Sequence, residues 1–188
     1  MTRIIAGAAG SLSLAVPDAG TRPTSDRVRE SLFGALEAGD RIADAAVLDL
    51  FAGSGALGLE ALSRGAASAD LVEKAPRAVS VVQRNVRAVS RAVPGARVRV
   101  HHSAVDTFLR ASTATFDLVF VDPPYDLDDT ALAGVLALLV PRLSSSAVVV
   151  VERATRSGAP EVPPGLRMFR DRKYGDTTLW WLQPASPE

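Results

Sequence analysis

Short apolar runs alternate along the chain with segments whose apolar residues recur at helical spacing. Val28, Leu32 and Leu36 lie four residues apart, which places them on one face of a helix that ends near Gly39. Residues 147–151 are apolar without interruption, as expected of a strand that is buried on both faces. This alternation predicts an α/β protein with a largely parallel sheet.

No internal repeat and no linker long enough to separate domains interrupts this pattern, so we expect a single domain over residues 1–188. Strands are expected at residues 46–51, 68–73, 97–101, 116–121, 147–151, 166–171 and 177–182. Helices are expected at about residues 24–39, after Gly55, and at 76–93, 104–111 and 128–142. Residues 1–24 should be irregular or form a hairpin, and the last two strands should form an antiparallel pair around Gly175.

Composition narrows the functional classes. The 21 basic and 21 acidic residues balance, which argues against a general polyanion binder that relies on many phosphate contacts. The chain has no cysteine, which excludes disulfides, thiolate metal sites and cysteine nucleophiles. The first residues lack the apolar run of a signal peptide, and no apolar run approaches the ~20 residues that cross a bilayer. We therefore expect a cytoplasmic protein.

A glycine-rich turn follows the first core strand. Residues 53–58 read Gly-Ser-Gly-Ala-Leu-Gly, a spacing that lets the chain turn sharply and lets a ligand approach the backbone beside a helix N-terminus. Glu73 ends the second strand, where a carboxylate accepts hydrogen bonds from ribose hydroxyls. A nucleotide-type cofactor is the favoured interpretation. A nicotinamide-dependent dehydrogenase would use the same layout, and a plain strand–helix turn remains the alternative.

Asp49 favours S-adenosylmethionine over a nicotinamide cofactor. It lies inside the strand, four residues before Gly53, and residues 49–58 resemble the first motif of S-adenosylmethionine-dependent methyltransferases. In that class the acidic residue faces the cationic amino group of the cofactor, which offsets the burial of its charge. No metal is required. The predicted cofactor-binding residues are Asp49, Phe51, Ala52, Gly53, Ser54, Gly55, Glu73, Lys74, Ala104 and Val105.

A second motif, Asp122-Pro123-Pro124-Tyr125, ends another apolar strand, where open α/β sheets bind ligands. The lone pair of an aromatic amine is delocalised into its ring. The Asp122 carboxylate and the Pro123 carbonyl can each accept an N–H bond, and these bonds strengthen as the nitrogen becomes sp³-like. Pro124 restricts the backbone, and Tyr125 can stack on the base. These residues are the predicted catalytic set. A proline-rich turn without function is the alternative.

Four segments together resemble the RsmD-type bacterial 16S rRNA guanine-N2 methyltransferases, over about residues 3–182. They are residues 22–33, 50–61, 122–125 and 173–177. The resemblance implies a Rossmann-like class I methyltransferase fold with a mostly parallel seven-stranded sheet, an antiparallel C-terminal pair and a small N-terminal hairpin and helix. It also implies methylation of the exocyclic N2 of one guanine in the small subunit or a late precursor. We expect a monomer with an RNA-contacting extension (residues 1–40) and a catalytic core (residues 41–188).

One segment departs from that family. Its members usually carry a basic stretch in the N-terminal hairpin, whereas residues 8–15 here contain no cation. Arg22, Arg27 and Arg29 are the predicted RNA-phosphate contacts that remain. A second basic group is interpreted mainly as surface charge, and it comprises Arg153, Arg156, Arg170, Arg172 and Lys173.

Other functions remain possible at this point. A DNA adenine-N6 methyltransferase also uses an Asp-Pro-Pro-Tyr motif, but the chain shows no extra target-recognition domain. A protein-glutamine methyltransferase is a less favoured hypothesis than the DNA enzyme. A nicotinamide-dependent oxidoreductase would leave Asp122 without a role, and a non-catalytic RNA-binding module would have no need of Asp122 and Tyr125. Cytosine-C5 methylation is excluded, because it needs a thiolate. His101 and His102 point to opposite strand faces, so a shared metal-ligand role is not expected.

Overall fold

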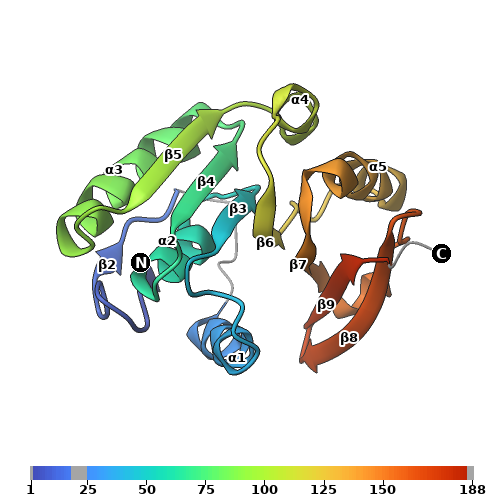
Figure 1. The fold of residues 1–188 in the computed structure, drawn as a ribbon, viewed down its shortest axis with the longest axis horizontal. Coiled ribbons are helices and arrows are strands. Elements are labelled where there is room, and N and C mark those ends of the chain that lie inside the picture. The colour runs from blue at the N-terminus through green and yellow to red at the C-terminus, as the bar shows by residue number, and fades with distance from the viewer. Residues whose placement is uncertain (1, 18–24, 186–188) are drawn as a thin grey trace.

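A seven-stranded sheet forms the centre of the protein in a computed structural model that describes residues 2–17 and 25–185. The strand order is β5-β4-β3-β6-β7-β9-β8 (Figure 1). The first five of these are parallel neighbours, and β9 runs antiparallel to both β7 and β8. The strands are β3 (Ala46–Leu50), β4 (Ser68–Glu73), β5 (Arg97–His102), β6 (Phe116–Val121), β7 (Leu143–Ala154), β8 (Leu166–Tyr174) and β9 (Thr177–Pro184).

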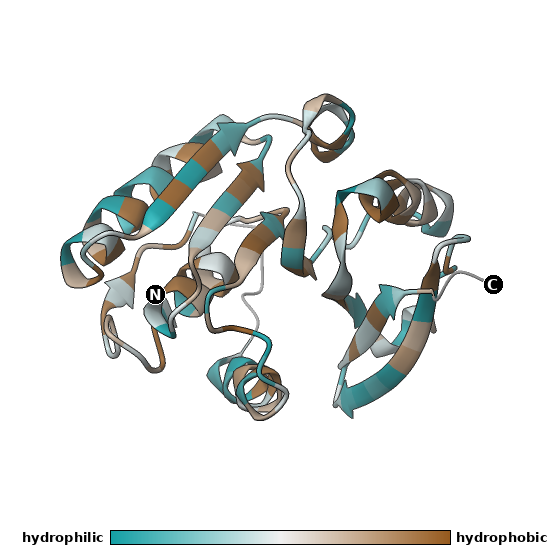
Figure 2. Ribbon diagram, viewed as in Figure 1, coloured by the Kyte–Doolittle hydropathy of each residue, from teal (hydrophilic) through white to brown (hydrophobic). Residues whose placement is uncertain are grey.

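Helices cover both faces of this sheet. One buried cluster joins α1, α2 and α3 to the sheet, and a second joins α4 and α5 to its other face. The helices are α1 (Asp26–Ala38), α2 (Ala56–Ser63), α3 (Pro76–Ala92), α4 (Val105–Ala111) and α5 (Asp129–Leu139), with 3₁₀ turns at Val140–Arg142 and Thr155–Ser157. Figure 2 shows apolar positions along the central strands and alternating polar and apolar positions on α3. The predicted α/β fold class and its antiparallel C-terminal pair are confirmed.

A short N-terminal hairpin packs beside α2. Its strands are β1 (Thr2–Arg3) and β2 (Ser13–Leu14). Ala8 N–H donates to the Ser63 carbonyl at 2.8 Å, and Gly7 lies so close that a Cβ there would be 1.9 Å from the same oxygen. The hairpin therefore depends on a glycine at this contact as well as on its own ladder.

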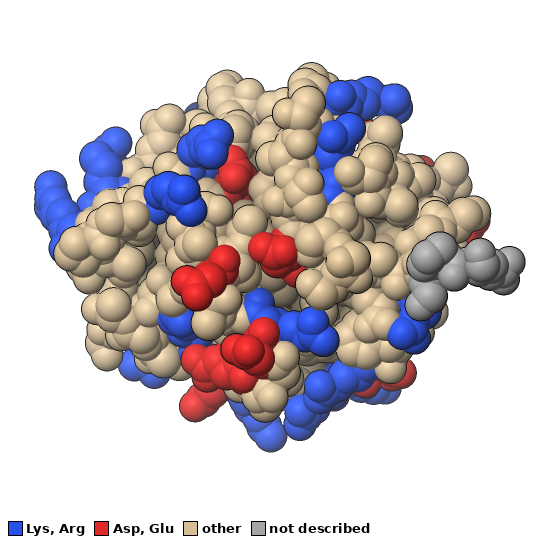
Figure 3. All heavy atoms as spheres, in the orientation of Figure 1, with Lys and Arg blue, Asp and Glu red and all other residues tan. Residues whose placement is uncertain are grey.

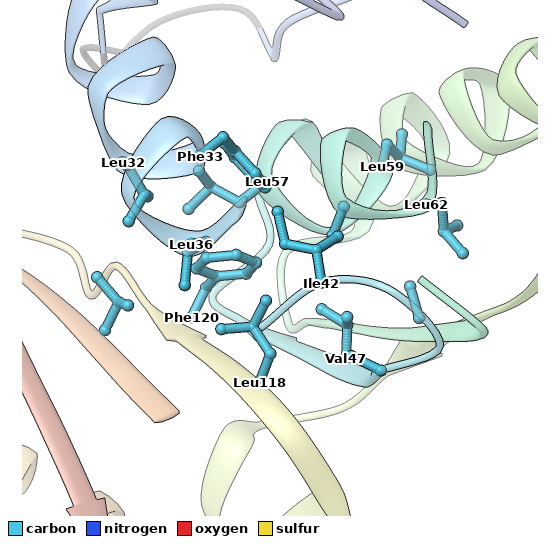
Figure 4. Packing of buried hydrophobic residues seen from close by; sticks show 14 of the residues in the cluster. Leu32, Phe33, Leu36, Ile42, Val47, Leu57, Leu59, Leu62, Leu118 and Phe120 are labelled. Carbon is cyan, nitrogen blue, oxygen red and sulfur yellow. The ribbon is translucent and has the colours of Figure 1, made fainter. Parts of the chain in front are cut away.

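Charged side chains of both signs are spread over the surface, with Lys and Arg gathered toward the lower rim of the face in Figure 3. In the buried cluster of Figure 4, Leu32, Phe33 and Leu36 of α1 pack near Leu118 and Phe120 of β6. The rings of Phe33 and Phe120 lie 5.6 Å apart, and both are fully buried. This contact attaches α1 to β6, the strand that leads into Asp122.

Several predicted boundaries differ from the structure. β8 ends at Tyr174 rather than at residue 171, and β9 ends at Pro184 rather than at residue 182. β7 begins at Leu143 rather than at 147, because Leu143 pairs with Phe116 ahead of a register shift. The extension was not predicted, because residues 144–146 are serines and interrupt the apolar pattern of the strand. The helix expected over 128–142 ends at Leu139 and continues as a 3₁₀ turn that contains Pro141, which has no N–H to donate.

Within residues 2–17 and 25–185, no helix is long and apolar enough to cross a membrane. In that same part of the chain, no group of three or more His, Asp or Glu side chains could hold a metal ion. His101 instead contacts Asp70, with 2.6 Å between Nε2 and Oδ1, and its ring lies 4.6 Å from that of Phe108.

Candidate active site

A cavity of about 510 Å³ opens at the carboxyl ends of β3, β4, β6 and β7. The order of the strands changes direction beside β3, so this edge is where an α/β sheet forms a ligand crevice. The structure brings the two sequence motifs together here. The predicted residues that line the cavity are Arg29, Asp49, Phe51, Ala52, Gly53, Ser54, Glu73, Lys74, Val105, Asp122, Pro123, Pro124 and Tyr125.

The loop between β3 and α2 turns through left-handed backbone. Phe51, Gly53 and Gly55 have φ angles of 60°, 57° and 78°. Gly55 is enclosed by packing, since a Cβ there would lie 2.6 Å from Cγ2 of Val82. Phe51 is the one non-glycine in this series, and such backbone in a bulky residue concentrates at functional sites.

The third glycine of the motif, Gly58, is required by close packing rather than by its φ angle. A Cβ on Gly58 would lie 2.3 Å from Cδ2 of Leu71 and 3.2 Å from Cβ of Asp49. The absence of a side chain lets α2 sit directly against β3 and β4. It also lets the Gly58 N–H, at the start of α2, donate to Oδ2 of Asp49 at 2.9 Å.

Asp49 is a buried carboxyl group at the floor of the cavity, with 1% of its surface exposed. Burial raises its pKa to about 7, the Gly58 N–H opposes that rise, and the charge of Glu73 adds to it. In the described part of the chain, no cation forms a salt bridge with this carboxyl. A ligand with a positive charge would supply the missing partner.

Glu73 holds the other side of the glycine loop. Its Oε2 accepts from the Gly53 N–H at 2.9 Å, and its Oε1 accepts from the Ala75 N–H at 2.8 Å. Each carboxylate oxygen can accept more than one hydrogen bond, so Glu73 can order the loop and still receive ligand hydroxyls.

Asp122 begins the turn that follows β6. The turn is closed by a bond of 3.0 Å from the Leu127 N–H to the Pro124 carbonyl. Desolvation raises the pKa of Asp122 well above its ordinary value, and the negative charges of Glu152 and Asp49 raise it further. Tyr125 is 68% exposed. An exposed aromatic ring beside a desolvated carboxyl group suits a planar ligand that stacks on one and hydrogen-bonds to the other.

Two predicted cofactor residues lie beside the cavity without lining it. Gly55 is the N-cap of α2, and Ala104 is the N-cap of α4. Val105 and Ser103, on either side of Ala104, do line the cavity. Val105 and Val72 give this part of the wall an apolar surface that suits a flat ring.

The three predicted RNA contacts differ in their exposure to solvent where the structure describes them. Arg22 lies outside the described residues, and Arg27 is exposed on α1. Arg29 is 1% exposed, so the expectation of a surface phosphate contact does not fit it. Its Nη2 donates instead to the Thr2 hydroxyl, the Arg3 carbonyl and Oδ1 of Asp26, at 2.7–2.9 Å. The periodicity of α1 gave no sign that an arginine would be enclosed by the N-terminal hairpin.

Sequence reasoning missed residues that come from distant segments. Thr2, Val16 and Pro17 line the cavity from the N-terminal side, and Glu152 and Arg153 line it from the end of β7. Arg153 was expected to be mainly surface charge, but its side chain is only 7% exposed and donates to Asp129 at the start of α5.

Asn85 is buried behind the same wall. Its Nδ2 donates to the carbonyls of Ala15 and Ser54 at 2.9 and 2.8 Å, and its Oδ1 accepts from the Ala15 N–H at 2.9 Å. This amide therefore joins the N-terminal segment to the glycine loop. A polar residue on the apolar stripe of Val82 and Val89 was the available signal.

Comparisons with known proteins identify the family of this chain. The family model described as "Conserved hypothetical protein 95" matches residues 2–183. The ribosomal RNA small subunit methyltransferase D of Escherichia coli strain K12 is 42% identical over 176 residues, which cover 92% of this chain and 85% of that protein.

Solved structures show the same fold. A hypothetical protein of Thermus thermophilus has a TM-score of 0.80 and 35% identity, over 96% of this chain and 98% of that one. A putative methyltransferase solved in complex with SAH has a TM-score of 0.63 and 14% identity, over 84% of this chain and 48% of that one, and supports the fold alone. By its family match and by its identity to a relative over most of both chains, this protein belongs to the Conserved hypothetical protein 95 family, of RsmD type.

Proposed function

We propose that this protein transfers a methyl group from S-adenosylmethionine to the exocyclic N2 of a guanine in 16S rRNA, within the small ribosomal subunit or a late precursor. The observation that carries the proposal is one cavity that holds both the glycine loop with Asp49 and the Asp122–Tyr125 turn. The E. coli relative is named a small-subunit rRNA methyltransferase, which supports rRNA as the substrate. We further propose that the protein acts as a monomer in the bacterial cytoplasm.

The residues of the cavity fit the cofactor. Its volume, about 510 Å³, lies in the usual range for small-molecule sites. We assign Asp49, a buried carboxyl group, to the amino group of the methionine end, and we assign Glu73, which accepts from the Gly53 N–H, to the ribose hydroxyls. When bound, the cofactor supplies a methyl group already activated by a positively charged sulfur, so the chain needs no nucleophile of its own.

Asp122 and its turn act on the amine of the target base. The carboxylate of Asp122 accepts one N–H bond and the carbonyl of Pro123 accepts the other, which directs the nitrogen lone pair out of the ring plane. Both interactions strengthen as positive charge develops on nitrogen in the transition state. Tyr125 offers its ring face to a base that has left the RNA stack.

We propose that RNA contact and catalysis are divided between two parts of the chain, an N-terminal extension (residues 1–40) and a core (residues 41–188). We assign RNA contact to the extension, where Arg27 is an exposed cation on α1. The core holds the cofactor and Asp122.

The proposal is tested by nucleoside mass spectrometry. The protein is incubated with isotopically labelled S-adenosylmethionine and, in parallel, with undermodified small subunits, free 16S rRNA and DNA. Labelled N2-methylguanosine from the subunits or the rRNA is the expected product. Labelled N6-methyladenine from DNA would replace the proposal with the DNA alternative, and label in neither nucleic acid would refute it.

Cofactor affinity is expected to increase with pH between pH 6 and pH 7. The pKa of Asp49 is about 7 in the free protein, and a bound cation favours its ionised form, so binding releases a proton. Below the pKa, protonated Asp49 must lose that proton, and the dissociation constant should therefore fall about fivefold from pH 6 to pH 7. Titration calorimetry in buffers of different ionisation enthalpy measures both the affinity and the proton release.

Asp49→Asn is the control for this pH dependence. It keeps the size of the side chain and an oxygen for the Gly58 N–H, but it cannot ionise. We expect weak binding that changes little over the same pH range. A fivefold pH effect that persists in Asp49→Asn would assign the titration to another carboxyl of the cavity.

A further inference from the structure

The outer strand of the sheet, β8, carries an unusual concentration of positive charge for a protein with no net charge. Its nine residues include four cations and one acid, and every cation is exposed. In Figure 3, blue side chains gather along the lower rim, where β8 lies in Figure 1. We name this surface the β8 ridge, and it consists of Arg167, Phe169, Arg170 and Arg172, while Lys173 points to the opposite face of the strand.

Aromatic rings support two of these arginines. The guanidinium of Arg170 lies 5.1 Å from the ring centre of Trp181, and that of Arg172 lies 5.4 Å from the ring centre of Tyr174. The Tyr174 hydroxyl lies 2.7 Å from the Ser31 hydroxyl of α1, which fixes the ring. Stacking orients the guanidinium plane and leaves its N–H edges available to a ligand.

The positive charges of the ridge are not neutralised by acidic side chains. Among residues 2–17 and 25–185, none of the ridge cations forms a salt bridge. Phe169 adds an apolar ring that is 43% exposed, with its centre 6.4 Å from that of the Trp181 ring. Arginines on aromatic supports next to an exposed ring match what a phosphate backbone and its unstacked bases require.

The ridge leads to the cavity. β8 ends at Tyr174, and the turn that follows it returns through Thr177, which lines the cavity. The Thr155 hydroxyl donates to the Gly175 carbonyl at 3.0 Å, which ties that turn to the end of β7. A strand of nucleic acid on the ridge would therefore be directed toward Asp122.

We propose that the β8 ridge is the docking surface for the sugar–phosphate backbone of the rRNA substrate, with Arg170 and Arg172 as phosphate contacts. This inference rests on the proposed function, and it adds the surface on which the rRNA backbone binds. It also accounts for the non-basic hairpin, because the cations missing from residues 8–15 have a counterpart on β8, at an edge of the main sheet. The competing explanation is that charges on an edge strand only prevent pairing with other chains.

The double variant Arg170→Gln/Arg172→Gln tests the ridge. Its dissociation constant for unmodified 16S rRNA transcript is measured at several salt concentrations beside that of the wild type. Loss of two phosphate contacts should weaken binding on the order of tenfold near 0.1 M salt, and should reduce the slope of log K against log salt by about two. S-adenosylmethionine affinity should be unchanged. Arg84→Gln/Arg87→Gln, an equal charge change at exposed positions of α3, should leave both quantities unchanged.

Three results would overturn the inference. Unchanged affinity and salt slope in the β8 variant would do so. So would self-association of that variant, seen by size-exclusion chromatography, with normal rRNA binding, since this is the edge-protection explanation. Weaker binding to assembled subunits but not to naked rRNA would identify a ribosomal protein as the partner of the ridge. A wild type that binds rRNA but labels guanine neither in small subunits nor in free 16S rRNA would refute the proposed function alone, because the binding data decide the ridge.

Discussion

Replacing Asp122 with alanine is expected to reduce kcat for methyl transfer by at least about 10²–10³-fold while cofactor affinity changes little. The size follows from the loss of a hydrogen-bond partner that acts mainly in the transition state. Cofactor affinity is preserved because Asp49, Glu73 and the glycine loop hold the other part of the cavity. Single-turnover methylation of small subunits gives the rate, and calorimetry gives the affinity.

Asp122→Asn separates charge from hydrogen bonding at the same position. The amide keeps one acceptor oxygen in nearly the same place, so activity should fall between that of the wild type and that of Asp122→Ala. The raised pKa of Asp122 adds a second signature. Acid should protonate the carboxyl and reduce the wild-type rate, whereas the rate of Asp122→Asn should not depend on this group.

Asp117→Asn is a matched control on the same strand. Asp117 lies near the start of β6, away from the cavity, and its Oδ2 accepts from the Ala46 N–H at 2.9 Å. The amide oxygen can still accept that bond, so activity should remain within about twofold of the wild type. Equal turnover in Asp122→Ala and Asp117→Asn would remove Asp122 from the mechanism.

The sheet and both motifs could be predicted because their signals are local. Each core strand is an apolar run, and the glycine loop and the Asp122 turn follow such runs directly. Parallel strands then bring their carboxyl ends together, so two segments about seventy residues apart meet in one cavity.

What could not be predicted depends on contacts between distant segments. Arg29 has the ordinary appearance of a surface cation at a helix start, and only the docked hairpin encloses it. Asn85 acquires its partners from residue 15 and from the glycine loop, neither of which is adjacent in sequence. Periodicity identifies which face of a helix is buried, but it does not identify which segment covers that face.

The buried charges beneath the hairpin lead to a second large effect. Glu60 of α2 is fully buried, and its oxygens accept from the N–H groups of Ile5 and Ala6 at 2.7 and 3.1 Å. It also accepts from Nε of Arg64 at 2.7 Å and lies 3.9 Å from Nη1 of Arg29. Glu60 thus accepts from two hairpin donors and from Arg64, and it adds a second negative charge beside Arg29, whose nearer acidic partner is Asp26 at 2.7 Å.

Glu60→Leu is therefore expected to lower the free energy of unfolding by about 3–5 kcal/mol. Removal of Glu60 leaves the N–H groups of Ile5 and Ala6 without their acceptor, and it leaves Arg29 and Arg64 with only their half-exposed partners Asp26 and Glu37. Loss of one member of a buried charge network costs more than the net value of the pair. Urea titration measures the change. If the variant does not fold, Glu60→Gln, which keeps an acceptor oxygen, should show a smaller loss of the same kind.

Glu37→Gln is the control, because Glu37 also pairs with Arg64, at 3.0 Å, but its side chain is 51% exposed. Solvent screens that pair, so the variant should lose at most about 1 kcal/mol. Hydrogen exchange at the hairpin amides locates the effect. Protection should fall first at Ile5 and Ala6 in Glu60→Leu and should be unchanged in Glu37→Gln. Because Thr2, in the same hairpin, lines the cavity, loss of the Glu60 anchor should also weaken cofactor binding. Equal stability of the two variants would mean that the hairpin is held by its backbone contacts to α2 rather than by Glu60.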